Sequence, residues 1–389
     1  MLDLGNPDTY LDGPPHERFS ELRACDPLHW QQSDEGGFWA VLRHADVEHV
    51  ARNPQLFSSA VGGVVLEDLD PPALAQMRGM LLAMDPPGHG AIRRPVAARL
   101  GRHHVAELED DIRTICQDVF ARTDSRVDFV KDLAARLPTQ VIGTVMGLPS
   151  DDWQMIHALA ERMTRGQDPL CVDDPDGAGQ ASLSMGLYAY EFAVARLSLD
   201  AARDDLTSVL LARHSPAEFA ALFVQLVAAG QDTTATLLSS GLLTLLQHPE
   251  QLAAVRTDLS LLPSAVEEML RYANPLHYFR RTATVDTELQ GKTIRSGDKV
   301  AMFYTSANRD EEVFERSQLF DVRRSPNRHL SFGFGEHFCL GAHLARLEAR
   351  VFFEELLVTY SSINLDGEPV RLRSNLNNAL RTLPIFVRR

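Results

Sequence analysis

Phe332-Gly333-Phe334-Gly335-Glu336-His337-Phe338-Cys339-Leu340-Gly341 is the stretch that decides the fold of this chain. Glycines separate aromatic residues and a single cysteine, and a helical pattern from about Gly341 to Tyr360 follows directly. Glycines permit unusual backbone angles and the close approach of a flat ligand. A cysteine just before a helix N-terminus gains positive potential and N–H donors, which favour a thiolate, a soft ligand suited to iron or copper. A buried structural cysteine beside a glycine turn is the simpler alternative.

The composition describes a large acidic chain with no visible subdivision. It has 389 residues, 44% of them hydrophobic, and a formal net charge of -15. Because no linker, low-complexity tract or fixed-period repeat interrupts it, we expect one domain over residues 1–389. The acidity argues against nucleic acid as the main partner, since phosphate binding requires a basic face.

The cysteines and the apolar segments indicate the compartment. Cys25, Cys116, Cys171 and Cys339 are far apart in the sequence and indicate neither a disulfide framework nor a zinc site. A reducing compartment is the simple inference. The N-terminus lacks a signal-peptide pattern, and the longest apolar stretch, Phe219 to Gly230, is shorter than the roughly 18 residues of a membrane span. We therefore expect a cytoplasmic protein without a membrane span.

Helical patterns dominate the chain, and the clearest one begins at Ser215. There a capping serine precedes a proline, with a glutamate three residues after the cap. This predicts a helix from Pro216 to Gln247, ended by His248-Pro249, on the order of 48 Å long at ~1.5 Å per residue. A helix is also expected over Phe129 to Met146, kinked or broken by Pro138. Short strands are expected at 278–285, 292–294 and 299–304, so the fold class is mainly α with minor antiparallel β sheets.

The complete glycine and cysteine loop resembles the heme-binding signature of the bacterial soluble cytochrome P450 family, FGxGxHxCxG, with every fixed position matched. The resemblance extends over nearly the whole chain. It implies a triangular prism with a long central helix over a heme b group. By the same resemblance Cys339 is the axial ligand of the iron, a role that thiolates play in this family. Phe332 would pack near the sulfur, His337 would hydrogen-bond a heme propionate, and Gly333 and Gly341 would shape the loop around the cofactor.

The middle of the long predicted helix carries an unusual polar turn, Ala229-Gly230-Gln231-Asp232-Thr233-Thr234. Glycine costs about 1 kcal/mol against alanine in a helix interior, and Thr and Asp compete for backbone hydrogen bonds, so we expect the helix to bend or open here. A polar patch beside a water-filled cleft is the simpler interpretation. The turn resembles the family's oxygen-activation motif. That assigns Thr233 to orienting O₂ and its proton supply and Asp232 to the neighbouring acid, with Ala229 and Gly230 facing the heme.

Two further groups of charged residues match the family. Glu268 and Arg271 lie three residues apart, which alone indicates only a solvated helix pair. Their resemblance to the ExxR motif implies a structural ion pair, joined by Arg324. The turn that contains His89 runs into a predicted helix with Arg93 one turn later, on the same face. The resemblance assigns His89, Arg93 and Arg281 to the heme propionates. Because side chains alternate along a strand, only one of Arg280 and Arg281 is expected to point inward, and the family pattern favours Arg281.

The family likeness also suggests where substrate binds. These candidate pocket residues are mostly apolar, which suits a greasy substrate, although they are equally consistent with ordinary core. They are Val64, Val65, Leu226, Leu276, Phe279 and Asn377. We expect hydroxylation of a steroid or terpenoid, with a natural-product (polyketide or macrolide-type) tailoring hydroxylase or epoxidase as the alternative. Asn377 and Asn378 weaken a simple sterol assignment, because they would add polar contacts.

The resemblance leaves three functional classes to compare and implies a set of partners. The leading hypothesis is an oxidoreductase, a monooxygenase that inserts one oxygen atom from O₂ and reduces the other to water. A non-catalytic heme sensor leaves the Asp232 and Thr233 pair unexplained, and peroxide-driven relatives tend to replace that pair. We expect no attached reductase, so electrons from NAD(P)H would arrive through a ferredoxin reductase and a ferredoxin. Five arginines are expected to form a local basic docking face, namely Arg94, Arg99, Arg102, Arg346 and Arg350.

Overall fold

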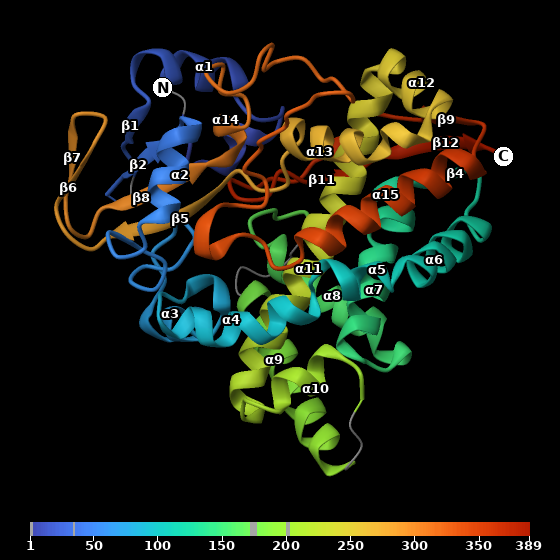
Figure 1. Cartoon of the computed structure of the whole chain (residues 1–389), viewed down its shortest axis with the longest axis horizontal. Coiled ribbons are helices and arrows are strands. Elements are labelled where there is room, and N and C mark those ends of the chain that lie inside the picture. Colours follow the sequence, from blue (N-terminus) through green and yellow to red (C-terminus); the bar gives the residue numbers. More distant parts are fainter. Residues whose placement is uncertain (1–2, 34–35, 172–176, 200–202) are drawn as a thin grey trace. The chain divides into compact units, whose positions relative to one another are not determined.

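The computed structural model describes residues 3–33, 36–171, 177–199 and 203–389 (Figure 1). The chain divides into two compact units, each assembled from stretches that lie far apart in the sequence. Unit 1 consists of Met1–Ile92, Glu267–Cys339 and Arg373–Asn378. Unit 2 consists of Arg93–Val266, Leu340–Leu372 and Ala379–Arg389. Helices α4 (Gly88–Arg99) and α13 (Leu262–Tyr272) each contribute residues to both units.

Unit 1 is built around a five-stranded sheet of order β1-β2-β8-β5-β3. Its strands are β1 (Leu28–Gln31), β2 (Phe38–Val41), β3 (Phe57–Ser58), β5 (Tyr278–Ala283) and β8 (Lys299–Phe303). All neighbours pair antiparallel, as expected, except β2 and β8, which run parallel. This parallel pair is a departure from the antiparallel sheets that the sequence predicted. A separate hairpin joins β6 (Thr287–Leu289) to β7 (Lys292–Ile294). The other elements are η1 (Pro7–Tyr10), α1 (His16–Cys25), α2 (His44–Arg52), α3 (Pro71–Arg78), η2 (Leu81–Ala83), α14 (Tyr304–Ala307) and η6 (Gly335–His337).

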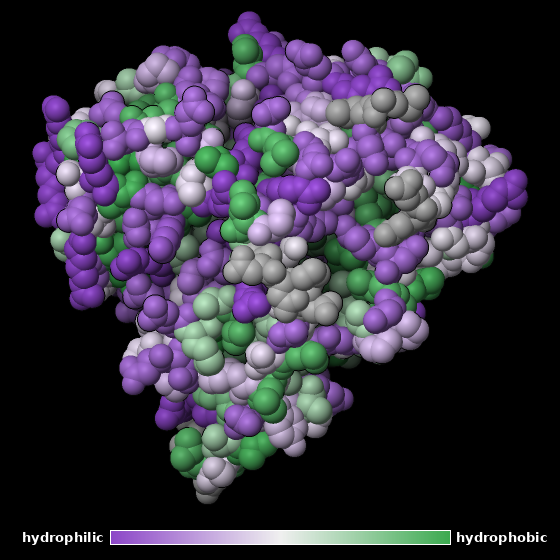
Figure 2. Space-filling view, turned by 180° about the vertical axis from the view of Figure 1, so that it is seen from behind, coloured by the Kyte–Doolittle hydropathy of each residue, from purple (hydrophilic) through white to green (hydrophobic). Residues whose placement is uncertain are grey.

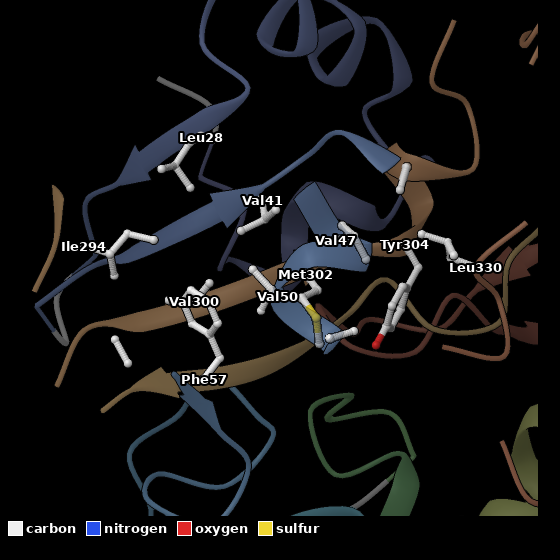
Figure 3. Close-up of a cluster of buried hydrophobic side chains, with 13 residues drawn as sticks. Leu28, Val41, Val47, Val50, Phe57, Ile294, Val300, Met302, Tyr304 and Leu330 are labelled. Atoms are coloured by element: carbon white, nitrogen blue, oxygen red, sulfur yellow. The ribbon is translucent and has the colours of Figure 1, made fainter. Parts of the chain in front are cut away.

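The main core of unit 1 lies between this sheet and α2 (Figure 3). Val47 and Val50 on α2 turn toward Val300 and Met302 on β8, and all four side chains are almost fully buried. Leu330 belongs to the same cluster. Because Leu330 stands two residues before the start of the glycine and cysteine loop, burial of its side chain holds the start of that loop against the core.

Unit 2 is mainly helical. Its helical elements are α5 (Arg102–Ala106), α6 (Glu109–Ala121), η3 (Val130–Ala134), α7 (Arg136–Met146), η4 (Ser150–Asp152), α8 (Trp153–Thr164), α9 (Gly177–Ser198), α10 (Leu206–Leu211), α11 (Pro216–Gln247), α12 (Pro249–Thr257), η5 (Leu259–Leu261) and α15 (Ala342–Thr359). Its strands are β4 (Arg126–Asp128), β9 (Ser362–Leu365), β10 (Val370–Arg371), β11 (Leu380–Thr382) and β12 (Pro384–Arg388). They form the antiparallel sheets β4-β12-β9 and β10-β11.

The long helix α11 has the bounds predicted from the sequence. The Ser215 side chain accepts from the Glu218 backbone N–H and completes a capping box, and Pro216 is the first helical residue. Every residue from Thr234 to Leu245 is buried, and α11 packs against α7, α8, α9 and α15. Among the described residues, no helix combines the length and apolarity needed to cross a membrane.

The segment 129–146 departs from its predicted form. A π-helical turn covers Val130–Ala134, and α7 then begins at Arg136. Pro138 therefore stands in the first turn of α7, where its missing N–H removes no helical hydrogen bond. The helix is irregular before Pro138, whereas the sequence predicted a kink or break at the proline itself.

A buried ion cluster joins α13 to the chain that leads toward the cysteine loop. Arg271 binds both Glu268 carboxylate oxygens at 2.7 Å, and both side chains are fully inaccessible to solvent. Arg271 also donates to the carbonyls of Asn308, Ser317 and Leu319. Glu268 accepts from Arg324 at 3.1 Å and from the backbone N–H of Asp321. Three residues singled out from the sequence, Glu268, Arg271 and Arg324, thus meet at one point.

We expect Arg271→Ala to lower the free energy of unfolding by about 3–5 kcal/mol, because it leaves the Glu268 charge buried with one fewer cation. Arg18→Ala is the matched control: Arg18 pairs with Glu21 at the same three-residue spacing, but both side chains are exposed. Its cost should stay below about 1 kcal/mol. Urea denaturation measures both, and equal losses would contradict a structural role for the buried pair.

Candidate active site

The loop before Cys339 depends on two glycines with left-handed backbone angles. Gly333 has φ +70° and Gly335 has φ +68°, a region that other residues rarely adopt. A Cβ at Gly335 would also lie 2.8 Å from the Ala51 carbonyl oxygen. The Cys339 N–H donates to the Phe332 carbonyl at 2.8 Å and closes the loop. The sequence prediction of a glycine-shaped loop ending at this cysteine is therefore met in detail.

The cysteine is followed at once by α15. Gly341 is the N-cap residue and the helix starts at Ala342. Cys339 is half-buried, and the rings of Phe332 and Phe338 lie beside each other with centroids 6.2 Å apart. A thiol close to a helix N-terminus lies in a positive potential, which favours a thiolate.

Two histidines from distant parts of the sequence meet in unit 1. The rings of His89 and His337 lie with centroids 4.2 Å apart, and the His337 Nε2 atom is 3.3 Å from the Ser59 hydroxyl. Asp85 accepts from the Ser59 backbone N–H at 2.8 Å, which holds this turn in place. The structure therefore brings together two of the side chains assigned to the propionates.

Arg280 and Arg281 are both buried, so burial alone does not test the expectation that only one of them points inward. Their partners nevertheless differ. Arg280 forms an ion pair with Asp68 at 3.2 Å, while Arg281 donates to the Arg280 carbonyl. Burial lowers the pKa of the Arg281 guanidinium, which the charge of the nearby Asp85 carboxylate partly opposes, and within the described chain no carboxylate lies within ion-pair distance of it. A buried cation without a carboxylate partner fits an anionic ligand group, which is what a heme propionate supplies.

Arg93 lies on α4 one helical turn after His89, as predicted, and is half-buried. The division between the two units falls between these residues, with His89 in unit 1 and Arg93 in unit 2. Its assignment to a propionate therefore stays a prediction from the family pattern.

The polar turn of α11 does not open the helix, contrary to expectation. The helix is continuous from Pro216 to Gln247, and the Thr233 hydroxyl donates to the Ala229 carbonyl at 2.9 Å within it. Such a bond lets a threonine satisfy its hydroxyl inside an unbroken helix. A Cβ at Gly230 would lie 3.1 Å from Ile142 on α7, so packing against α7 also explains the glycine.

One strip of α11 is left uncovered. Leu226, Gly230 and Thr233 are half-buried and Ala229 is exposed, whereas Val227 beside them is fully buried. The spacing of the first four places them on one helix face. The family motif assigns the heme and O₂ to this strip, and that assignment stays a prediction.

Asp232 lies close to the end of α8. Burial raises the pKa of its carboxyl, and Arg165 and the Thr164 hydroxyl partly oppose this rise. Arg165 is itself paired with Glu161 at 2.8 Å. The carboxyl therefore retains its proton to a higher pH than an ordinary aspartate, which suits a group that passes protons inward.

Sequence reasoning missed a histidine beside this turn. The Nδ1 atom of His157 on α8 lies 3.2 Å from the buried Gln231 side chain and 3.1 Å from the Thr139 hydroxyl. It links three helices next to Asp232. An isolated histidine in a helical pattern carries no signal of such a contact, because its partners come from segments about 20 and 70 residues away in the sequence.

The candidate substrate residues fall into both units. Leu276 and Asn377 form a bridge between two segments of unit 1, and Phe279 packs at the edge of the main core near Tyr304. Val64 is buried and Val65 is half-buried, while Leu226 lies in unit 2. Leu276, Phe279 and Asn377 thus belong to one region, and the pocket assignment itself stays a proposal.

Comparison with known proteins identifies the family. A family model described as Cytochrome P450 matches residues 191–386. The methyl-branched lipid omega-hydroxylase of Mycobacterium tuberculosis is 38% identical, covering 99% of this chain and 94% of that protein. The steroid C26-monooxygenase of Mycolicibacterium smegmatis is 33% identical, covering 95% and 90%. A solved cytochrome P450 from Mycobacterium marinum in complex with pseudoionone has a TM-score of 0.91 at 35% identity, covering 99% of this chain and 98% of that one.

The chain belongs to the cytochrome P450 family. The predicted fold class and enzyme class, a heme-thiolate monooxygenase, are confirmed, and the family implies heme iron and the use of O₂. The similar proteins are named as a hydroxylase and a monooxygenase, so the heme sensor has no support among them.

We expect Arg281→Ala to accelerate the loss of heme at least about 10-fold, because it would remove the charge-assisted hydrogen bond to a propionate that the family pattern assigns to this arginine. Arg280→Ala is the matched control, since the Arg280 side chain is equally buried but pairs with Asp68. Transfer of heme to excess apomyoglobin measures the rate. If both variants lost heme equally fast, Arg281 would have no specific contact with it.

Proposed function

We propose that this P450 hydroxylates apolar molecules that carry a methyl-branched chain, with steroids and terpenoids as the leading classes. The support comes from what the similar proteins have in common. One is named for the end of a methyl-branched lipid, one for C26 of a steroid, and one holds pseudoionone. The steroid C26 position ends a methyl-branched side chain, and pseudoionone is an acyclic branched ketone. The shared chemical feature is a flexible apolar chain with methyl branches.

The heme, when bound, supplies the chemistry of O₂ activation, and this chain's residues hold and orient it. We assign Cys339 to the iron, with Phe332, Gly333 and Gly341 shaping the surroundings of the sulfur. His89, His337 and Arg281 would bind the propionates, joined by Arg93. All four carry N–H donors and none adds negative charge, which matches the two carboxylates of the cofactor.

Asp232 and Thr233 would supply the protons that O₂ reduction consumes. The support is their place on α11: the Thr233 hydroxyl lies on the uncovered strip, and the Asp232 carboxyl has a raised pKa. A carboxyl with a raised pKa holds its proton to a higher pH than an ordinary aspartate, which makes it better suited to deliver that proton. Arg165 and Glu161, paired beside Asp232, would keep that carboxyl in a polar setting.

Asn377 and Asn378 are the two asparagines expected to add polar contacts, and Asn378, together with the nearby Asn375, has a structural role. Asn375 donates to the Gly5 carbonyl at 2.7 Å, and Asn378 donates to the Asn274 carbonyl at 2.9 Å. These amides anchor the 373–378 segment within unit 1. Because Asn378, one of the two asparagines expected to add polar contacts, is engaged in this way, the segment gives the tailoring alternative less support than the sequence alone did.

We assign electron delivery to a small acidic ferredoxin and its NAD(P)H-dependent reductase. In unit 2, Arg102 on α5 and Arg346 on α15 both lie close enough to His343 to depress its pKa, in addition to the larger effect of burial. Arg346 and His343 stand in the first turns of α15, the helix that follows Cys339. The docking face contains fewer than the five arginines expected from the sequence, because Arg350 pairs with Glu109 and Glu354.

The substrate class is tested by spectral titration and product analysis. A cholestane-type steroid and a methyl-branched fatty acid should bind and become hydroxylated on the branched chain, whereas an unbranched fatty acid and a macrolide should bind at least about 10-fold more weakly. Preference for the macrolide would favour the natural-product alternative and overturn the proposed class.

Thr233→Ala should keep heme and substrate binding but reduce product formed per NAD(P)H by about 10-fold or more, with peroxide released instead, because proton supply is impaired. Thr234→Ala is the control, since Thr234 is adjacent but buried. An unchanged yield in Thr233→Ala would remove it from proton delivery.

Arg346→Glu should slow reduction of the iron by ferredoxin about 10-fold at low salt, and added salt should shrink the difference from the wild type. Arg122→Glu, at the exposed end of α6, should have no effect. A rate in Arg346→Glu equal to that of the wild type at low salt would argue against docking on this cluster.

A further inference from the structure

Helix α9 is apolar on two opposite faces. Its inner face packs against α8 and α11 through buried residues that include Met185, Ala189 and Ala193. A second row, on the outside, consists of side chains that are between 46% and 65% exposed. These are Leu183, Leu187, Tyr190, Val194 and Leu197. At about 100° per residue, this outer row lies diametrically opposite the buried face. We call it the outer stripe.

The spacing of the outer stripe is that of a helix–helix seam. Its members follow one another at intervals of four, three, four and three residues, which is the a and d pattern of a coiled coil. A surface helix with one partner needs one apolar face, and a helix that is apolar on both faces is normally covered on both. Figure 2 shows hydrophobic side chains gathered at the lower end of the view, where Figure 1 places the end of α9.

We propose that the outer stripe is a dimer interface, in which α9 packs antiparallel against α9 of a second copy of this chain. In a two-fold arrangement centred on Tyr190, Leu183 meets Leu197 of the second copy and Leu187 meets Val194. The stripe is thus complementary to itself, as the interface of a symmetric dimer must be. This inference is independent of the proposed substrate.

The small number of charged residues on α9 favours a second copy of this chain over a redox partner or a membrane. The 22-residue helix contains two charged residues, Glu191 and Arg196, and Arg196 is buried in an ion pair with Asp205 at 2.7 Å. An acidic redox partner would need a basic surface, and a helix lying on a membrane would carry lysines and arginines beside its apolar face. Neither feature is present on α9, and the chain as a whole carries a charge of -15.

The exposed area is sufficient for association. The five side chains together leave on the order of 500 Å² uncovered, at the upper end of the largest apolar patch on a typical monomer. Two copies would therefore bury on the order of 1,000 Å² from the stripe alone, which reaches the lower limit of a specific interface. We accordingly expect a reversible dimer.

Sedimentation velocity of the heme-loaded full chain, from about 1 to 200 µM, tests the proposal. The wild type should shift from monomer to dimer, and Leu187→Glu combined with Val194→Glu should raise the dissociation constant at least about 100-fold. Val285→Glu combined with Val358→Glu is the control, because these exposed valines lie outside α9. Circular dichroism confirms that each variant is folded. A wild type that stays monomeric, or a dimer that the α9 variant leaves intact, overturns the proposal.

A cross-linking experiment tests the antiparallel register separately. In a Cys25→Ser background, which removes an exposed native thiol, Tyr190→Cys should form a disulfide-linked dimer under mild oxidation, because position 190 faces itself across the axis. Ser184→Cys, exposed on the flank of α9, should not. Cross-linking at position 184 but not 190 overturns the register.

A vesicle experiment distinguishes a lipid surface from a second copy of the chain. If the wild-type protein pelleted with phosphatidylcholine vesicles and the α9 double variant did not, the outer stripe would bind a lipid surface instead.

Discussion

The carboxylate of Glu268, held out of water between Arg271 and Arg324, is the constraint on which the cysteine loop depends. An ionised carboxylate at full burial is costly unless cations and N–H donors surround it. Here they come from its own helix and from the 317–327 segment. The cluster therefore ties α13 to chain that is remote in sequence.

Hydrogen bonds that begin at the Glu268 cluster hold the cysteine loop in position. Arg271 donates to the Asn308 carbonyl, and the Asn308 side chain accepts from the Leu330 N–H at 2.7 Å. The Ser331 hydroxyl donates to the Leu270 carbonyl, back on α13. Phe332 follows at once, and its carbonyl accepts from the Cys339 N–H. A chain of hydrogen bonds thus runs from a buried ion pair to the backbone of the proposed iron ligand, which explains how a structural motif supports chemistry it does not touch.

Local signals in the sequence predicted much of this. Caps and prolines set the ends of α11, since these depend on adjacent residues. The fixed spacing of the cysteine loop indicated its glycine angles and the helix after it. The family resemblance singled out Glu268, Arg271 and Arg324 together.

Tertiary contacts account for what the sequence could not show. The π-helical turn before α7, the link from His157 to Gln231 and the pairing of Arg280 with Asp68 all depend on partners brought close only by folding. The polar turn of α11 stays helical because Thr233 bonds within the helix and Gly230 fits against Ile142. The exposure of the outer stripe of α9 could not be predicted for a different reason. Apolar spacing alone does not distinguish a helix face that packs inward from one that faces solvent.

Carbon monoxide binding to the reduced protein tests the central claim, that Cys339 is the thiolate ligand of a heme iron. The account predicts the strongly red-shifted Soret absorption of a thiolate-ligated complex in the wild type, and its loss in Cys339→His with heme still bound. Persistence of the red-shifted band in Cys339→His would contradict the assignment, as would a wild type that binds heme without ever showing the band.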